Sequence, residues 1–345
     1  MRIIIATTIE PFVSGGDAVM VDSLEQILSR AGHDVETLRL PFLPSYTEML
    51  DQMLALRLFD LGDTADRLIA IRTPSYLLRH RNKVLWFIHH HRSAYDFWGT
   101  EYGDMPDTPE GRRYRKAILT ADGMAFAEAR AIFTNSRVVS RRLEEFNQVA
   151  SEVLYPPLLN PERYVCREYG DSIVYVSRIV RHKRQHLAIE ALAQTRTAVR
   201  LTIAGPSHDP DYRSELERLA DRHGVRERLV FRPEWISESE KIDILSNSLA
   251  ALYLPWDEDS YGYAALEAQQ ASKAVVTTSD SGGPLELIEH ESNGLVVKAD
   301  AHSVAAAMDR LFADRTLAMR LGERGRARIS ELGITWDNVL PRLLA

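Results

Sequence analysis

The sequence contains a single cysteine, Cys166, in 345 residues. A disulfide within the chain needs two cysteines, and a thiolate zinc cluster needs several. The composition therefore excludes an intramolecular disulfide framework and a Cys-based zinc site. A reducing cytoplasm is the compartment that this cysteine content predicts.

Long apolar runs are also lacking. No run reaches the roughly 18–20 residues that a membrane-spanning helix requires. The apolar stretch within residues 1–8 is too short for the hydrophobic region of a secretory signal peptide. We expect a cytoplasmic protein, and peripheral contact with the inner membrane face remains open.

The chain has no excess of basic residues. Lys and Arg number 42 against 49 Asp and Glu, which gives a net charge of −7. This balance argues against a dedicated nucleic-acid partner. The length suggests two domains of about 150–200 residues each, and the composition does not indicate an oligomeric state.

Strand-like and helical segments alternate along both halves of the chain. Residues 3–7 and 35–38 are predicted strands on either side of a helical pattern over 18–31, and the alternation restarts at residues 172–176. This pattern predicts an α/β fold with two Rossmann-like, doubly wound domains facing across a cleft. We expect domains over residues 1–160 and 161–330, joined by a proline-rich linker near 153–161. Residues 331–345 are expected to form a helix that packs back toward the first domain.

An acidic loop lies between a buried strand, residues 250–255, and a helix that begins after Gly262. Free backbone amides and the positive end of a helix dipole favour an anion there, most often a phosphate. Two acids of this region, Asp259 and Glu267, are unsuited to binding phosphate but suit sugar or ribose hydroxyls. The segment therefore predicts a site for a phosphorylated sugar.

Positive charge for such a phosphate is found about 80 residues earlier. Arg178 and Lys183 follow the predicted strand 172–176, and together they would neutralise a diphosphate. A solvated basic loop is the alternative for this pair. Gly15 and Gly16, at the end of the first strand, are placed either to approach a ligand or simply to form a turn.

Three consecutive histidines end the apolar segment 84–88. Successive residues of a strand point to opposite faces, so His89, His90 and His91 cannot all bind one metal, and no nearby acid completes a site. We expect no metal here. One or two of these histidines would face the ligand cleft, or they would cap the sheet through ordinary hydrogen bonds.

These motifs, in this order, resemble retaining glycosyltransferases of the GT-B fold, specifically family 4. The resemblance rests on Arg178 with Lys183, on the acid-x7-acid pair Asp259 and Glu267, and on the Gly-Gly-Pro-Leu-Glu segment at 282–286. It covers nearly the whole chain, more loosely in the first half. The chain departs from the family at Asp259, where glutamate is usual, and at Ser260, where glycine is usual.

The resemblance implies a role for each donor-side residue. The donor diphosphate would be bound by amides or cations of Gly15, Gly16, Arg178, Lys183, Tyr261 and Gly262. Glu267 would bind the ribose and Asp259 a hydroxyl of the donor sugar. The base would lie near Gly205 and Trp235, and these residues do not distinguish uracil from guanine.

The resemblance also implies a catalytic group and an acceptor side. His89 would lie near the anomeric carbon, and Asp259, Arg178 and Lys183 would complete the catalytic set. The acceptor would contact His91, Arg92 and Asp96. The implied reaction uses a UDP- or GDP-sugar as co-substrate, needs no other cofactor and no metal, and transfers a hexose to a hydroxyl group.

Three other functions fit parts of the sequence. A sugar-nucleotide epimerase or hydrolase has the same fold, and a non-catalytic sugar-nucleotide-binding protein is suggested by Asp259 and Ser260. A nicotinamide oxidoreductase would need a Gly-x-Gly-x-x-Gly turn after the first strand. Residues 14–16, Ser-Gly-Gly, match that turn poorly.

Overall fold

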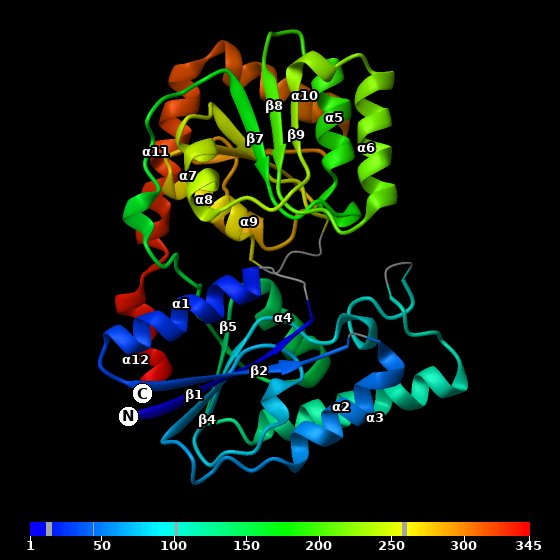
Figure 1. Ribbon diagram of the computed structural model, residues 1–345, viewed down its shortest axis with the longest axis vertical. Coiled ribbons are helices and arrows are strands. Elements are labelled where there is room, and N and C mark those ends of the chain that lie inside the picture. The colour runs from blue at the N-terminus through cyan, green and yellow to red at the C-terminus, as the bar shows by residue number, and fades with distance from the viewer. Residues whose placement is uncertain (12–15, 44, 101–102, 257–260) are drawn as a thin grey trace. The chain divides into compact units, whose positions relative to one another are not determined.

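The computed structural model describes residues 1–11, 16–43, 45–100, 103–256 and 261–345 (Figure 1). Contacts divide the chain into two compact units. Unit 1 comprises residues 1–159 together with 334–345, and unit 2 comprises residues 160–333. Each unit is described by itself.

Unit 1 is built on a parallel sheet of six strands in the order β2-β1-β3-β4-β5-β6. The strands are β1 (Arg2–Ile9), β2 (Asp34–Pro41), β3 (Arg67–Ala70), β4 (Lys83–Phe87), β5 (Ala131–Thr134) and β6 (Glu152–Val153). The helices of this unit are α1 (Gly16–Arg30), α2 (Tyr46–Leu58), α3 (Pro109–Ala127), α4 (Arg137–Asn147) and α12 (Trp336–Leu344), with short 3-10 turns η1 (Ser75–Leu77) and η2 (Arg92–Ala94).

The end of the chain is part of unit 1. The indole N–H of Trp336 donates to the carbonyl of Leu158 at 2.9 Å, and its ring meets Trp86 edge-on at 6.1 Å. The buried Arg67 donates to the carbonyl of Leu343 at 2.7 Å. Helix α12 is thus fixed by hydrogen bonds at both of its ends.

Unit 2 is built on a second parallel sheet, in the order β12-β11-β10-β7-β8-β9. Its strands are β7 (Ser172–Val176), β8 (Arg200–Ala204), β9 (Leu229–Arg232), β10 (Ala250–Leu252), β11 (Ala274–Thr278) and β12 (Gly294–Val297). Counted within the unit and read from the β9 edge, this is the order 3-2-1-4-5-6 of dinucleotide-binding Rossmann sheets.

Helices cover both faces of the second sheet. They are α5 (Gln185–Gln194), α6 (Pro210–Arg222), α7 (Glu238–Ser246), α8 (Tyr263–Gln270), α9 (Pro284–Leu287), α10 (Ala301–Ala313) and α11 (Arg315–Glu331), with short 3-10 turns η3 (Pro161–Arg163), η4 (Arg181–Lys183) and η5 (Arg226–Arg228). Helix α5 packs against α6 and α10, whereas α8 and α9 pack against α11 (Figure 1). Every residue of β10 and β11 is buried, as expected for central strands covered on both faces.

The prediction of two doubly wound α/β domains is confirmed. Near the end of unit 2, α10 and α11 are separate helices, because the carboxylate of Asp314 caps α11 by accepting from the amide of Leu317 at 2.9 Å. In the proline-rich linker, β6 covers only residues 152–153. Pro156 and Pro157 have no N–H to donate to a neighbouring strand.

Candidate functional site

The two central strands of unit 2 mark where a ligand would bind. Open α/β sheets bind ligands outside the carboxyl ends of the strands, at the point where the strand order reverses. In unit 2 this point lies between β7 and β10, which pair through Ile173 and Ala250. Residues 177–184 follow β7 and residues 253–262 follow β10. The cations and the acidic loop singled out from the sequence therefore leave neighbouring strands at the same edge of the sheet.

Lys183 lies where these two loops meet. Its Nζ donates to the hydroxyl of Tyr253 at 2.8 Å, and only 7% of the residue is exposed. The hydroxyl of Tyr175 donates to the carbonyl of Lys183 and accepts from the amide of Leu254 at 3.0 Å. One buried tyrosine thus ties both loops together beside the lysine.

Arg184, the last residue of the first loop, binds the second loop and the end of β11. Its Nε donates to the carbonyl of Leu254 and its Nη2 to the carbonyl of Pro255, both at 2.7 Å. Its guanidinium also binds the carboxylate of Asp280 at 2.8 and 2.9 Å, in a bidentate pair. Burial raises the pKa of Asp280, but the hydrogen bonds from Arg184 and Thr278 outweigh it and hold that pKa below its ordinary value.

Sequence reasoning did not single out Arg184. It is the last residue of a basic run, 181–184, in which spacing alone does not separate a structural cation from a ligand-binding one. Its partner Asp280 is 96 residues further along the chain. No local signal connects the two.

Arg178 differs from its neighbour Arg184. Its side chain is half-buried, and its carbonyl accepts from the side-chain amide of Gln185 at 2.9 Å. Among the residues that the structure describes, none accepts a hydrogen bond from the Arg178 guanidinium. This side chain therefore keeps its donors for a ligand or for solvent.

The helix N-terminus predicted beside the acidic loop is present. Gly262 precedes α8 with a φ of +93°, which an L side chain rarely adopts. A Cβ added there would come within 2.9 Å of Pro284 Cγ and 3.3 Å of Tyr253. The close neighbours that require glycine are thus side chains of the same unit. Tyr261 is buried edge-on against Tyr263, whereas Asp259 and Ser260 lie outside the described residues.

Glu267 is buried, with 6% of the residue exposed, and its charge is paired. Its carboxylate accepts from the ammonium of Lys241 and, at 3.3 Å, from the hydroxyl of Tyr164. Burial and the nearby Glu267 charge raise the pKa of the Tyr164 hydroxyl. Lys241 was not predicted, because it lies on α7, 26 residues earlier.

The two residues predicted beside the base follow β8 and β9. Gly205 has a φ of +137°, and a Cβ there would lie 2.1 Å from the carbonyl oxygen of Ser177. Close packing of the ends of β7 and β8 therefore requires this glycine. Trp235 is 69% exposed and offers an aromatic face to its surroundings.

In unit 1, His89 has a defined tautomer. Its Nδ1 lies 2.7 Å from the carbonyl oxygen of His90. A carbonyl can only accept, so Nδ1 carries the proton and Nε2 carries the lone pair. Burial lowers the pKa of His89, which keeps the ring neutral near physiological pH.

A charged pair accompanies the glycine turn of unit 1. Gly16 begins α1, and the next residue, Asp17, pairs with Arg72 at 2.9 Å. Arg72 neutralises the carboxylate beside the amide predicted to bind phosphate. Sequence reasoning missed Arg72, although it lies two residues after the end of β3, at the carboxyl edge of the sheet. Gly15 lies outside the described residues.

The predicted acceptor residues are largely engaged with each other. Arg92 Nε donates to the carboxylate of Asp96 at 2.8 Å, and Arg142 approaches the same carboxylate at 3.2 Å. Burial lowers the pKa of His91 to about 4, and its Nε2 has no hydrogen-bond partner within the described part of the chain. Arg92 and Asp96 are therefore bonded to each other, whereas the Nε2 atom of His91 has no such bond to a described residue.

A buried polar chain that sequence reasoning missed runs beneath the histidines. His90 Nε2 lies 2.8 Å from the side-chain oxygen of Asn147, whose amide donates to the hydroxyl of Tyr95. The hydroxyls of Tyr95 and Tyr76 donate to Asp122 at 2.7 and 2.9 Å. Burial raises the pKa of Asp122 to about 7 and lowers that of His90 to about 4.

Two kinds of site are absent from the described residues. They contain no group of three or more His, Cys, Asp or Glu side chains arranged to bind a metal ion. No helix formed by them has the length and apolar character needed to cross a bilayer.

Comparisons with known proteins agree with the resemblance found in the sequence. Residues 163–328 match the family model described as glycosyl transferases group 1. This segment contains nearly all of unit 2, including both loops of the candidate site. The predicted resemblance to GT-B glycosyltransferases is thereby confirmed.

Two curated relatives are mannosyltransferases. The human alpha-1,3/1,6-mannosyltransferase is 26% identical over 286 residues, which cover 74% of this chain and 65% of that protein. The GDP-mannose-dependent alpha-(1-6)-phosphatidylinositol monomannoside mannosyltransferase of Mycobacterium tuberculosis is 27% identical over 233 residues, which cover 61% of this chain and 59% of that protein. This chain therefore matches less than two thirds of the length of either relative.

A solved structure supports the fold of the whole chain. Anabaena HepE, determined in complex with UDP and glucose, matches with a TM-score of 0.72 over 100% of both chains, at 15% identity. At this identity the likeness shows that the two chains share the GT-B fold.

A substitution at Gly262 tests the close packing at the start of α8. Gly262→Ala places a methyl group in the left-handed region and 2.9 Å from Pro284, so we expect a loss of roughly 2–4 kcal/mol in the free energy of unfolding. Gly224→Ala is the matched control, because Gly224 also has a positive φ but nothing within 4 Å. Urea unfolding should show a clearly smaller loss for the control, and equal losses would contradict the packing account.

The pKa of Asp122 predicts a pH dependence of stability. Between about pH 4 and 7 the folded chain keeps the Asp122 proton that the unfolded chain releases, so this group makes stability fall as pH rises. His90, whose pKa is lowered to about 4, acts in the opposite direction. We expect Asp122→Asn to make the free energy of unfolding rise more steeply over this range than in the wild type.

Denaturant titrations at several pH values would measure how the free energy of unfolding changes with pH in the wild type and in Asp122→Asn. Asp107→Asn, which removes an exposed carboxylate near the start of α3, is the control substitution. An Asp122→Asn slope that matches the wild type would show that Asp122 titrates normally.

Proposed function

We propose that this chain, which over residues 163–328 matches the family model of the group 1 glycosyl transferases, transfers a hexose from a nucleoside-diphosphate sugar to a hydroxyl acceptor with retention of anomeric configuration. The donor carries a diphosphate, a ribose, a base and a sugar. The candidate site offers a different set of side chains for each of these parts.

One observation carries the proposal. Lys183 is fixed at the switch point of a Rossmann sheet, bonded to Tyr253 of the neighbouring loop, with Gly262 opening α8 on that same loop. A cation and a helix N-terminus together suit a diphosphate. Arg178, whose guanidinium has no acceptor among the described residues, would add a second cation.

The remaining donor contacts follow from the same edge of the sheet. In the proposal Glu267 accepts from ribose hydroxyls in addition to Lys241, and Asp259 accepts from a hydroxyl of the sugar. The base lies near Gly205 and stacks on the exposed ring of Trp235. Because one curated relative is named as GDP-mannose-dependent, GDP-mannose is the first donor to test, followed by UDP-sugars.

Groups of unit 1 would act on the sugar and the acceptor. His89 is neutral with its lone pair on Nε2, so it can accept a hydrogen bond from a hydroxyl near the reacting carbon. Gly15 and Gly16 would offer amides to the diphosphate, with Asp17 neutralised by Arg72. His91, Arg92 and Asp96 would lie on the acceptor side.

The proposed chemistry is stabilisation of charge. As the bond between the anomeric carbon and the diphosphate breaks, negative charge builds on the diphosphate. Cations and amides that are already in place stabilise this charge most effectively. The acceptor would attack from the leaving-group face, with a diphosphate oxygen taking its proton. Nuclear magnetic resonance of the first product tests retention, whereas a covalent adduct on Asp259 found by mass spectrometry would contradict this mechanism.

Replacement of Lys183 tests the diphosphate site directly. We expect Lys183→Ala to lower the transfer rate from GDP-mannose or a UDP-sugar by about 10²–10³-fold, the range seen when one charge-stabilising donor is removed. Arg181→Ala is the matched control, since Arg181 is a cation of the same short helix η4 that already pairs with Glu215 at 2.8 Å on the surface. A Lys183→Ala variant as active as Arg181→Ala would refute the assignment.

A further inference from the structure

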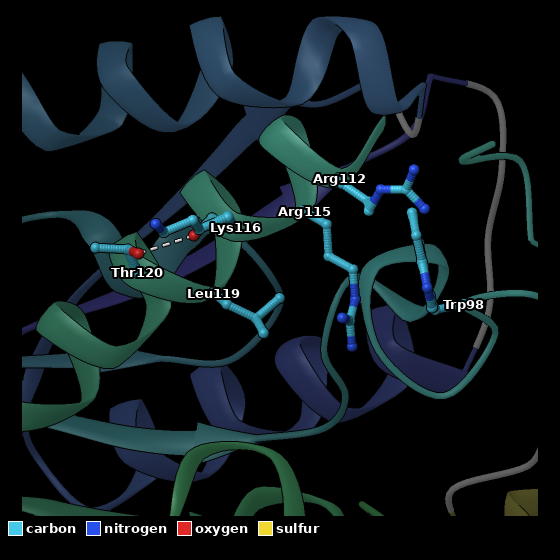
Figure 2. A pocket seen from close by; sticks show the side chains of 6 residues that line it. All are labelled: Trp98, Arg112, Arg115, Lys116, Leu119 and Thr120. Atoms are coloured by element: carbon cyan, nitrogen blue, oxygen red, sulfur yellow. Dashed lines mark hydrogen bonds between the residues drawn. The ribbon is translucent and has the colours of Figure 1, made fainter. Parts of the chain in front are cut away.

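Unit 1 contains a hollow that the proposed transfer reaction does not use. It has a volume of about 470 Å³ and is lined by residues of α3 and by the loop after η2: Trp98, Arg112, Arg115, Lys116, Leu119 and Thr120 (Figure 2). This volume is within the range of small-molecule sites. Three of the six lining residues are cations, one is an aromatic ring and one is aliphatic.

The cations of this hollow share one face of α3. Arg112, Arg115 and Lys116 are spaced at i, i+3 and i+4, which places like charges next to each other on the helix surface. None of the three has an acid three or four residues away along the chain, an arrangement that costs helix stability. Arg113, which does not line the hollow, does have such an acid, Glu110, at i−3.

Protein partners leave most of this positive charge uncompensated. Arg112 pairs with Asp107 at 2.5 Å, but both side chains are more than half exposed, and such surface pairs are weak. Arg115 Nε donates to the carbonyl of Ala94 at 2.8 Å, which fixes the side chain without neutralising it. Lys116 makes no ion pair with any residue that the structure describes.

Helix α3 is held so that this face stays outward. Its Tyr114 meets Tyr46 of α2 edge-on at 5.8 Å, and its Ile118 is buried in the core of the unit. Gly111 approaches the backbone so closely that a Cβ there would lie 1.9 Å from the carbonyl oxygen of Pro106. The cationic face is therefore part of a fixed surface.

The hollow also has an apolar side, formed by Trp98 and Leu119. The guanidinium of Arg115 lies 5.1 Å from the centre of the Trp98 ring, and Figure 2 shows Arg112 reaching from the helix toward the same ring. Leu119 continues the helix face by one turn. Positive charge and hydrocarbon thus line the same hollow.

We infer that this hollow binds an amphiphilic phosphate ester, with the phosphate against Arg112, Arg115 and Lys116 and the hydrocarbon against Trp98 and Leu119. Guanidinium groups match the geometry of phosphate oxygens and bind them in bidentate fashion. A Trp ring beside cations suits a ligand that is charged at one end and apolar at the other. This inference concerns binding in unit 1 and stands apart from the transfer reaction.

Calorimetry on the whole chain at low salt tests the inference with three probes. Dihexanoyl phosphatidic acid carries both a phosphate and short hydrocarbon chains, inorganic phosphate lacks the hydrocarbon, and dihexanoyl phosphatidylcholine masks the phosphate with a choline. We expect the first probe to bind at least about tenfold more tightly than either of the others. Equal affinity for inorganic phosphate would overturn the apolar half of the site, and equal affinity for phosphatidylcholine would overturn the cationic half.

Variants of α3 distinguish binding in the hollow from general electrostatic attraction to a basic helix. Arg112→Gln combined with Lys116→Gln should weaken binding of dihexanoyl phosphatidic acid by about tenfold or more. Arg113→Gln removes a charge from the same helix outside the hollow and should change the affinity less than about twofold. Equal weakening by Arg113→Gln, or no binding by the wild type, would overturn the inference. Because no sugar donor is used, these results do not depend on whether the chain transfers sugar.

Discussion

The candidate site depends on the bonds that hold the loop after β7 to the loop after β10. Arg184 alone makes five hydrogen bonds, which reach two carbonyls of the second loop and two side chains at the end of β11. The amide of Trp256 adds a bond to the carbonyl of His182 at 2.9 Å. The carboxyl ends of β7, β10 and β11 are therefore held together, and Lys183 lies among them. A cation held in place before the ligand arrives stabilises developing charge without reorganising.

Acids that follow the strands are neutralised in both units, as Asp17 is by Arg72, Asp96 by Arg92 and Arg142, and Asp280 by Arg184. Unit 2 has two further cations at its sheet edge. Arg178 keeps its donors, and Lys183 is bonded to a tyrosine hydroxyl. These two cations agree with a phosphate-binding role for unit 2.

Features with a local signature could be predicted from the sequence. Apolar runs located several strands, and Gly262 located the start of the helix after the acidic loop. Pairings between distant residues could not be predicted, because no spacing rule connects them. Arg184 with Asp280 and Lys241 with Glu267 are of this kind, and so is the burial of Asp122 between two tyrosines.

The central claim is that unit 2 recognises a diphosphate through Lys183 and Arg178. Calorimetric titration of the wild-type chain with GDP and GMP, and with UDP and UMP, tests it most directly. For the base that the chain prefers, the diphosphate should bind at least about tenfold more tightly than the monophosphate, because one more charged group meets fixed cations. Raising the salt concentration should reduce that advantage. Equal affinities for the diphosphate and the monophosphate of both bases would contradict the account.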